Sequence, residues 1–408
     1  MSTTDQLGAP PSRGFREHGP ALLVALGHGA THWNLALLYM LLPFIARELG
    51  LSYTETGALM TFYHGSSFAA NVGSGAVVDI SGRRVVVQAG ALVVGGAALF
   101  AMGLAANVFW LAIPVMLIAM TNNIWHPAAI SYLSRLYPNG RGFALSIHTL
   151  GASFGDILAP AVGALLLLAL SWRGVTMVAA LPVFAIAVIL LVVLTEIRND
   201  NPAGAPGGGK LGHYLHGLRG LVQNKAVLAL CLLAGFRSMV QNGMLMFIPL
   251  YLVGALNAGP KLVGFAAIAI QIGGVVAGPV AGAWSDRIGR QPVVLVGLVA
   301  TTLLVGSLAI VKGAVLFVTM VFLLGFALFA VRPVVQSWMI DMTPKHLDGS
   351  AISLLFGSQS GMTMLVPIVG GIIADTWGIG SVFYFLTATV LCATLIAAVM
   401  PSGKVERG

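Results

Sequence analysis

Residues 282–290 read Gly-Ala-Trp-Ser-Asp-Arg-Ile-Gly-Arg and lie between two long apolar stretches. A related segment, Gly-Ala-Val-Val-Asp-Ile-Ser-Gly-Arg-Arg, occupies residues 75–84. The first glycine and the aspartate of the two segments are each separated by 207 residues. Because both segments follow an apolar run, they predict a chain built from two related halves.

The composition around these segments is typical of a membrane protein. Of the 408 residues, 58% are hydrophobic and 8% are charged, and the mean hydropathy is +0.93. Soluble proteins carry about 25% charged residues, so this chain has too few polar residues to cover a water-soluble fold. The net charge of +8 comes from basic residues in short loops between apolar runs. Those positions indicate membrane topology and exclude a nucleic-acid partner.

Apolar runs divide the chain into candidate membrane spans. A spanning helix needs about 20 mostly apolar residues. Twelve such runs cover approximately 20–46, 55–78, 85–105, 109–134, 142–168, 174–195, 226–253, 260–283, 292–312, 315–340, 350–374 and 380–400. We therefore expect an all-α membrane protein with twelve transmembrane helices in two pseudo-symmetric six-helix bundles. The predicted parts are a tail over 1–19, a bundle over 20–195, a connector over 196–225, a bundle over 226–400 and a tail over 401–408.

The lysine and arginine residues predict the orientation of the spans, because cytoplasmic loops carry an excess of them. With both termini cytoplasmic, the opposite side of the membrane has only Arg47, Arg173, Lys261 and Lys312. The cytoplasmic side then has fifteen: Arg13, Arg16, Arg83, Arg84, Arg135, Arg141, Arg198, Lys210, Arg219, Lys225, Arg287, Arg290, Lys345, Lys404 and Arg407. We therefore predict a multi-pass protein of the bacterial inner membrane with both termini inside.

Further residue pairs keep nearly the same offset between the halves. They are Pro43 with Pro249, Gly57 with Gly264, His126-Pro127 with Arg332-Pro333, Pro138 with Pro344, and Pro160 with Pro367. Two parallel repeats of six helices are the plan of many secondary transporters, in which the substrate binds near the membrane midplane between the repeats. The repeat therefore predicts transport.

The two loop segments give the chain a resemblance to the major facilitator superfamily. The loop signature of that family, G-x3-D-[RK]-x-G-R-[RK], is similar to both segments, with Ile80 in place of a basic residue in the first. The resemblance covers the whole chain and implies alternating access, with the loop residues holding one conformation. The alternative, that the arginines only fix topology, accounts for Arg84 but not for the glycine and aspartate spacing. The implied gating residues are Gly75, Asp79, Gly82, Arg83, Gly282, Asp286, Arg287, Gly289 and Arg290.

Residues 123–160 resemble, within that superfamily, the fosmidomycin-resistance type of efflux protein. The similarity lies in a Trp-His-Pro segment at 125–127 and a glycine-rich fifth span, although Ala128 replaces the glutamate that is frequent there. Residues 155–163, Gly-Asp-Ile-Leu-Ala-Pro-Ala-Val-Gly, are also similar to the antiporter motif of the fifth helix. Its matching residues are Gly155, Pro160 and Gly163. These resemblances imply export by antiport.

Ionisable side chains inside the predicted spans mark the candidate functional site, because such groups are costly in lipid and usually face a cavity or a partner. They are His28, His32, His64, His126, His148 and Asp156 in the first half, and Arg237 and Arg332 in the second. The family resemblance implies that spans one, four, seven and ten line the central path. On that basis His32, His126, Arg237 and Arg332 converge on it.

The chemistry of these side chains predicts an anionic substrate and proton coupling. Arginine stays charged and presents a planar fork that suits carboxylate or phosphate groups, and histidine titrates near neutral pH. The predicted substrate-binding residues are Arg237, Arg332, His32, His126 and Asn34, and the predicted proton-coupling residues are Asp156, His32 and His126. The alternative is that Asp156 pairs with an arginine or a histidine and only stabilises the bundle.

We therefore expect a proton-coupled efflux transporter of a small, anionic organic compound, acting as a monomer in the lipid bilayer. Proton-coupled uptake of an organic anion is the alternative, and a membrane enzyme or receptor is a remote one. His28 and His32 have a spacing compatible with zinc, but Gly29 stands where a H-E-x-x-H motif has glutamate. No Walker sequence occurs. We expect no catalytic residues, no cofactor and no metal.

Overall fold

The computed structural model describes residues 15–138, 140–195, 221–311, 313–343 and 347–400. Most of the predicted N-terminal tail, most of the predicted connector and all of the predicted C-terminal tail lie outside these residues, as does the side chain of Asp79. Helix α1 begins within the predicted tail, at Phe15. The helices of the first half are α1 Phe15–Leu49, α2 Tyr53–Ser81, α3 Arg84–Met102, α4 Val108–Leu136, α5 Arg141–Leu166 and α6 Trp172–Val193. Those of the second half are α8 Lys225–Gly254, α9 Pro260–Ile288, α10 Arg290–Leu308, α11 Ala314–Asp341, α12 Asp348–Thr363, α13 Leu365–Trp377 and α14 Ser381–Val399.

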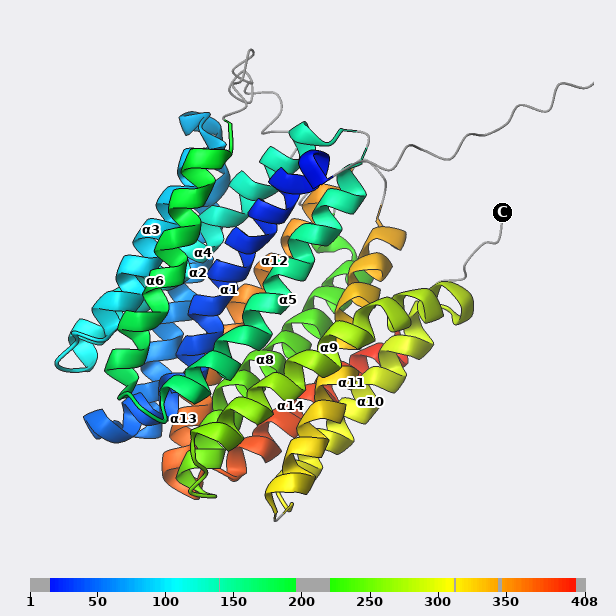
Figure 1. Ribbon diagram of the computed structural model, residues 1–408. Coiled ribbons are helices and arrows are strands. Elements are labelled where there is room, and N and C mark those ends of the chain that lie inside the picture. The colour runs from blue at the N-terminus through cyan, green and yellow to red at the C-terminus, as the bar shows by residue number, and fades with distance from the viewer. Residues whose placement is uncertain (1–14, 139, 196–220, 312, 344–346, 401–408) are drawn as a thin grey trace, which may run out of the picture.

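The predicted all-α membrane fold is confirmed. In the described residues, eleven helical segments are long and apolar enough to cross a membrane. The remaining predicted span corresponds to α2, which is not among these eleven. Its 29 residues are long enough at about 1.5 Å per residue to cross a hydrocarbon core of about 30 Å. Figure 1 shows the helices of the first half, blue to green, on one side and those of the second half on the other.

The eleventh span is divided, where the sequence predicts one continuous helix over 350–374. Helices α12 and α13 meet at Met364. Pro367 has no N–H, so the carbonyl of Thr363 four residues earlier cannot receive its helical hydrogen bond. The carbonyl of the next residue, Met364, accepts a hydrogen bond from Thr61 Oγ1 of α2 at 3.1 Å. The break therefore gives the first half a polar contact with the second.

The two halves repeat the same helix pairing. In the first half the closest pairs are α1–α5, α2–α4, α3–α4 and α3–α6. The corresponding pairs of the second half are α8–α12, α9–α11, α10–α11 and α10–α14. This agreement supports the internal repeat that the sequence predicts. Contacts between the halves are made mainly by α2 with α13 and by α5 with α9.

The halves are packed tightly at the end where α2 begins and α13 ends, which the charge pattern predicts to be the outer side. Asp375 of α13 accepts hydrogen bonds from the backbone N–H groups of Tyr53 and Thr54, at 3.0 and 2.8 Å. A Cβ atom added to Gly57 or Gly371 would overlap backbone atoms of the opposite half. This end of the molecule is therefore closed.

The opposite ends of the interface helices have a different environment. Gly73 of α2, Gly142 of α5, Gly282 of α9 and Gly357 of α12 have no neighbouring heavy atom, among those described, within 4 Å of an added Cβ. The same helices thus pack backbone to backbone at one end and have free space beside their glycines at the other. This difference indicates that the halves diverge toward the predicted cytoplasmic side.

Candidate functional site

Five ionisable residues come together near the middle of the first half. They are His28 and His32 of α1, His126 of α4, and His148 and Asp156 of α5. His28 and His32 are separated by one helical turn, so they share a face of α1. The rings of His28 and His148 stack with centroids 3.9 Å apart, and the rings of His28 and His32 meet edge to face at 4.8 Å.

Close packing of α1 against α5 brings these residues together. A Cβ atom added to Gly151 would overlap the carbonyl of Ala25, and one added to Gly155 would overlap the carbonyl of Gly29. Small residues at a helix interface let two backbones touch. The glycines of the fifth span therefore position the polar cluster, because longer side chains would separate α1 from α5.

His32 and Asp156 form the most direct polar pair of the cluster. His32 Nδ1 lies 3.1 Å from each carboxylate oxygen of Asp156. The His32 and Asp156 side chains are 23% and 21% exposed, so a small molecule or a proton can reach them. The predicted residues His32, His126 and Asp156 are thus brought to one place.

The two arginines of the second half have different surroundings. Arg332 of α11 has an exposed side chain in the middle of its helix and interacts electrostatically with Asp156 and His126 of the other half. Its side chain therefore borders open space between the halves. Arg237 of α8 is 2% exposed and donates hydrogen bonds from Nε and Nη2 to the carbonyl of Leu328, at 3.2 and 2.9 Å. This contact fastens α8 to α11.

Asn34 is not brought to the cluster. Its side chain is buried, and a Cβ atom added to Gly95 of α3 would lie 3.1 Å both from Asn34 Nδ2 and from Thr121 Oγ1 of α4. It therefore packs within the first half. His64 of α2 is also placed apart, since its Nε2 atom lies 3.2 Å from the hydroxyl oxygen of Tyr39.

Known proteins match this arrangement over the whole chain. The family model of the Major Facilitator Superfamily matches residues 24–259 and 230–406. The chain belongs to the major facilitator superfamily. Multidrug resistance protein MdtG of Escherichia coli O6:K15:H31 is 23% identical over 380 residues, covering 91% of each chain. Multi-drug resistance efflux pump PmrA of Streptococcus pneumoniae serotype 4 is 30% identical over 155 residues, covering 37% of this chain and 38% of the relative.

A solved superfamily structure has the same fold. The nucleoside transporter NupG, as a point mutant, aligns with a TM-score of 0.81 at 15% identity, covering 93% of this chain and 98% of that chain. The chain is therefore a multi-pass membrane transporter of the superfamily, and the efflux-type resemblance is confirmed by the relatives. These relatives are transporters, which indicates a transporter rather than an enzyme.

The second superfamily loop signature forms a network of side-chain hydrogen bonds around the turn between α9 and α10, within one half. Arg290 at the start of α10 donates a hydrogen bond from Nη1 to Ser285 Oγ at 2.7 Å and another to the carboxylate of Asp286. Its Nε donates to Asp341 at the end of α11, at 2.8 Å. Gly289 has φ +97°, a conformation that favours glycine. The signature therefore fixes the turn between α9 and α10, and Arg287 is exposed.

The first loop signature has a corresponding glycine and a buried arginine. Gly82 ends α2 with φ +62°, so a tight turn explains this glycine as well. Arg83 is exposed, whereas Arg84 is 1% exposed and its Nε donates a hydrogen bond to Ser131 Oγ of α4 at 2.9 Å. The sequence suggests that Arg84 only sets the membrane topology. Its side chain also joins α3 to α4.

The residues of the fifth-helix motif let neighbouring helices pack closely against α5. Gly155 faces α1, Gly163 lies against Leu37 and Met40 of α1, and the carbonyl of Pro160 lies 3.0 Å from a Cβ added to Gly264 of α9. The motif therefore lies between α1 on one side and the second half on the other.

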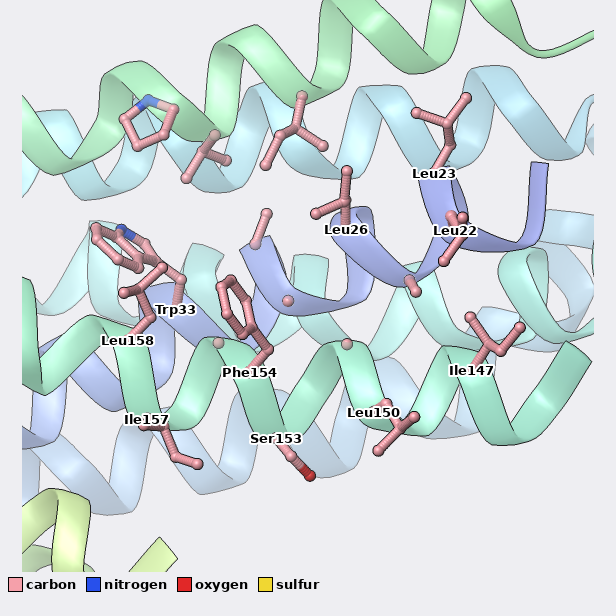
Figure 2. Close-up of a pocket in the computed structure, with 18 of the residues that line it drawn as sticks. Leu22, Leu23, Leu26, Trp33, Ile147, Leu150, Ser153, Phe154, Ile157 and Leu158 are labelled. Carbon is pink, nitrogen blue, oxygen red and sulfur yellow. The ribbon is translucent and has the colours of Figure 1, made fainter. Parts of the chain in front are cut away.

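A hydrophobic cavity of about 1140 Å³ lies between α1, α5 and α6 and also includes Val275 of α9. Figure 2 shows Trp33, Phe154 and Leu158 lining it together, with Leu22 and Leu26 further along α1. Gly29 and Gly155 also line it and are chain neighbours of His28 and Asp156. The five residues of the polar cluster do not line the cavity, so the two features share helices α1 and α5 but not a common surface.

Two members of the cluster, named from the sequence only as ionisable residues within spans, and one residue outside the cluster were not assigned a role from the sequence. His28 and His148 are in direct contact with the predicted residues, and Asp375 joins the halves. The spacing of His28 from His32 was a signal for the first. The contact of Asp375 with α2 joins residues 322 apart in the chain, so no local pattern could have indicated it.

Proposed function

We propose that this transporter exports a small amphiphilic compound with an anionic group, in exchange for protons, across the bacterial inner membrane. The observation that carries the anion-binding part is the exposed Arg332 side chain opposite Asp156 and His126. A guanidinium group beside open space is suited to bind carboxylate or phosphate oxygens. Arg237 supports this site indirectly, because it holds α8 against α11.

Export is supported by the relatives, which are named as multidrug resistance and efflux proteins. An amphiphilic substrate is supported by the hydrophobic cavity formed in part by α1 and α5, the helices that also carry most of the polar cluster. In this proposal the apolar part of the substrate lies against residues such as Trp33 and Phe154, and its anionic group reaches Arg332. The protein acts as a monomer with both termini in the cytoplasm.

Proton coupling is assigned to Asp156, with His32 as its hydrogen-bonding partner. Asp156 is the only acidic residue within the described spans that lies near both a histidine and an arginine of the other half. A proton on Asp156 removes its negative charge and so changes the interaction between the halves. This makes the carboxylate suited to couple protonation to the conformational cycle.

The electrostatic interaction of Asp156 with Arg332 favours a second candidate, proton-coupled uptake of an anion. An anion that binds Arg332 competes with the Asp156 carboxylate, so protonation of Asp156 and anion binding favour each other electrostatically. Such cooperation moves the proton and the anion in the same direction. Antiport instead requires that the substrate and the proton exclude each other.

A flux assay separates the two candidates and tests Arg332. Purified protein in proteoliposomes is given a panel of labelled organic anions, with pH gradients of both signs. Export by antiport predicts that anions move against the proton flux, whereas symport predicts movement with it. Arg332→Ala should reduce anion flux at least about tenfold, since hydrogen bonds to charged groups contribute about 1.5–3 kcal/mol.

Arg47→Ala is the matched control for this assay, because Arg47 is exposed at the end of α1. It should leave anion flux unchanged. Wild-type flux of every transported anion in Arg332→Ala would remove Arg332 from the substrate site.

A further inference from the structure

The hydrogen bonds of two histidines leave a space for a cation. His28 Nδ1 lies 2.7 Å from the carbonyl oxygen of His148, and His126 Nδ1 lies 2.6 Å from the carbonyl oxygen of Asn122. A carbonyl oxygen only accepts hydrogen bonds, so both Nδ1 atoms must carry hydrogen. In the neutral rings both Nε2 atoms are then unprotonated acceptors.

These two Nε2 atoms face each other at 3.1 Å. Two acceptor lone pairs at this distance repel each other unless a cation lies between or beside them. Zinc binds imidazole nitrogen at about 2.0–2.1 Å, which places two ligand nitrogens of a tetrahedral site about 3.3 Å apart. The spacing of His28 and His126 therefore fits two ligands of one metal ion.

His32 supplies a third nitrogen. One ring nitrogen of each of His28, His32 and His126 lies within 4.8 Å of those of the other two. His32 Nδ1 is directed at the carboxylate of Asp156, which leaves Nε2 as the free acceptor. A small shift of the His32 ring that keeps its Nδ1 hydrogen bond to Asp156 would complete a set of three nitrogens.

The second layer of contacts matches that of known metal sites. Histidine ligands almost always donate their other ring N–H to a carbonyl or a carboxylate, which fixes the tautomer. Here two of the three rings donate to carbonyls and the third to Asp156. We propose that His28, His32 and His126 bind one divalent transition-metal ion, with Zn²⁺ as the reference ion.

The charges around the site suit such an ion. Asp156 provides one negative charge beside His32, and the three neutral imidazoles provide none. Three histidine ligands leave a fourth position open. Arg332 interacts electrostatically with both His126 and Asp156, so an anionic fourth ligand would be attracted by the metal and the guanidinium group together.

All three ligands belong to the first half, in α1 and α4, so movement of one half relative to the other leaves the site intact. The sequence shows a zinc-compatible spacing for His28 and His32, but the absence of an H-E-x-x-H motif led to the expectation of no metal. The third ligand comes from another helix, so the sequence could not indicate it. The inference is independent of the proposed function, since metal binding is measured without transport.

The test is a calorimetric titration of detergent-purified full-length protein, free of any polyhistidine tag, with Zn²⁺ at neutral pH. A parallel titration with Co²⁺ reports tetrahedral coordination through the visible absorption of the ion. We expect one ion per chain in the wild type. His28→Gln and His126→Gln should each weaken binding at least about tenfold, and Asp156→Asn should weaken it about 10-fold to 100-fold as a second-layer partner.

His64→Gln is the matched control, because His64 is a partly buried histidine that contacts Tyr39 instead of the cluster. It should bind Zn²⁺ like the wild type. Gel filtration establishes that each variant is folded, and His126→Gln serves if the more deeply buried His28→Gln does not fold. Lack of Zn²⁺ binding by the wild type would overturn the proposal. So would Zn²⁺ binding by both His28→Gln and His126→Gln that is as tight as that of the wild type. In either case a shared proton would occupy the space between the two rings.

Discussion

Individual residues of the same type have different roles because their surroundings differ. Arg237 and Arg332 both lie mid-helix, and the sequence gives no reason to separate them. Arg237 is buried against the carbonyl of Leu328, whereas Arg332 is exposed and faces Asp156. Arg332 is consequently the better candidate for binding a substrate, and Arg237 stabilises the second half.

Asp156 gives the prediction at this scale. Asp156→Asn keeps the size of the side chain and removes its negative charge. We expect a pH gradient to drive transport at least about tenfold less well, because the amide cannot exchange a proton, while substrate exchange without a gradient continues. The measurement is flux in proteoliposomes with and without the gradient.

Glu48→Gln is the control for Asp156→Asn, since Glu48 is an acidic residue that pairs with Arg173 outside the cluster. It should retain gradient-driven transport. Gradient-driven flux at the wild-type rate in Asp156→Asn would exclude Asp156 as the proton carrier.

Helix contacts rather than single side chains determine where the cluster lies. Gly151 and Gly155 allow α1 and α5 to touch, and this contact places histidines of α1 beside Asp156. In the second half, Pro367 divides one span into α12 and α13. Small residues and prolines thus set the geometry of the polar groups.

Gly151 gives the prediction at the element scale. In Gly151→Ala the new Cβ overlaps the backbone of Ala25, so α1 and α5 must move apart. We expect the free energy of unfolding to fall by about 1–3 kcal/mol, the usual cost of overpacking. The change would be measured as a lower apparent melting temperature in detergent.

Gly142→Ala is the matched control, because Gly142 lies on the same helix and an added Cβ meets no described atom within 4 Å. It should be neutral, or stabilising by about 0.5–1 kcal/mol through helix propensity. Equal melting temperatures for Gly151→Ala and the wild type would show that α1 and α5 tolerate separation.

The whole molecule consists of two similar halves that are closed at one end. Asp375 of α13 binds the N-terminal N–H groups of α2, where the helix dipole favours a negative charge. Ser52 and Glu55 cap the same helix end from within the first half. Asp375 is therefore a cap that also links the halves.

Asp375 gives the prediction at the scale of the molecule. Asp375→Ala should favour separation of the halves at this end by about 1.5–3 kcal/mol, given the usual value of hydrogen bonds to charged groups. Spin labels on the outer ends of α2 and α13 report the change, with longer distances expected in the variant.

Glu55→Gln is the control for Asp375→Ala, because it weakens the cap of α2 without removing a contact between the halves. It should leave the distance distribution unchanged. The same shift in both variants would mean that capping of α2, and not the link to α13, controls the closed end.

The sequence by itself determined the membrane class, the helix positions, the two-fold repeat and the superfamily. These depend on composition, on runs of about 20 apolar residues and on motifs in short loops, all of which are local in the chain. The polar residues of the site, His32, His126 and Asp156, were also predictable as rare ionisable groups inside apolar spans.

Only the tertiary structure decided which of these groups meet. The Nε2 contact of His28 with His126 joins residues 98 apart, and Asp375 meets Tyr53 across the two halves. The tertiary structure also placed Asn34 against α3 and α4, and Arg237 against Leu328. Such distances depend on how closely helix backbones approach, which is set by packing between distant segments and leaves no pattern within any one of them.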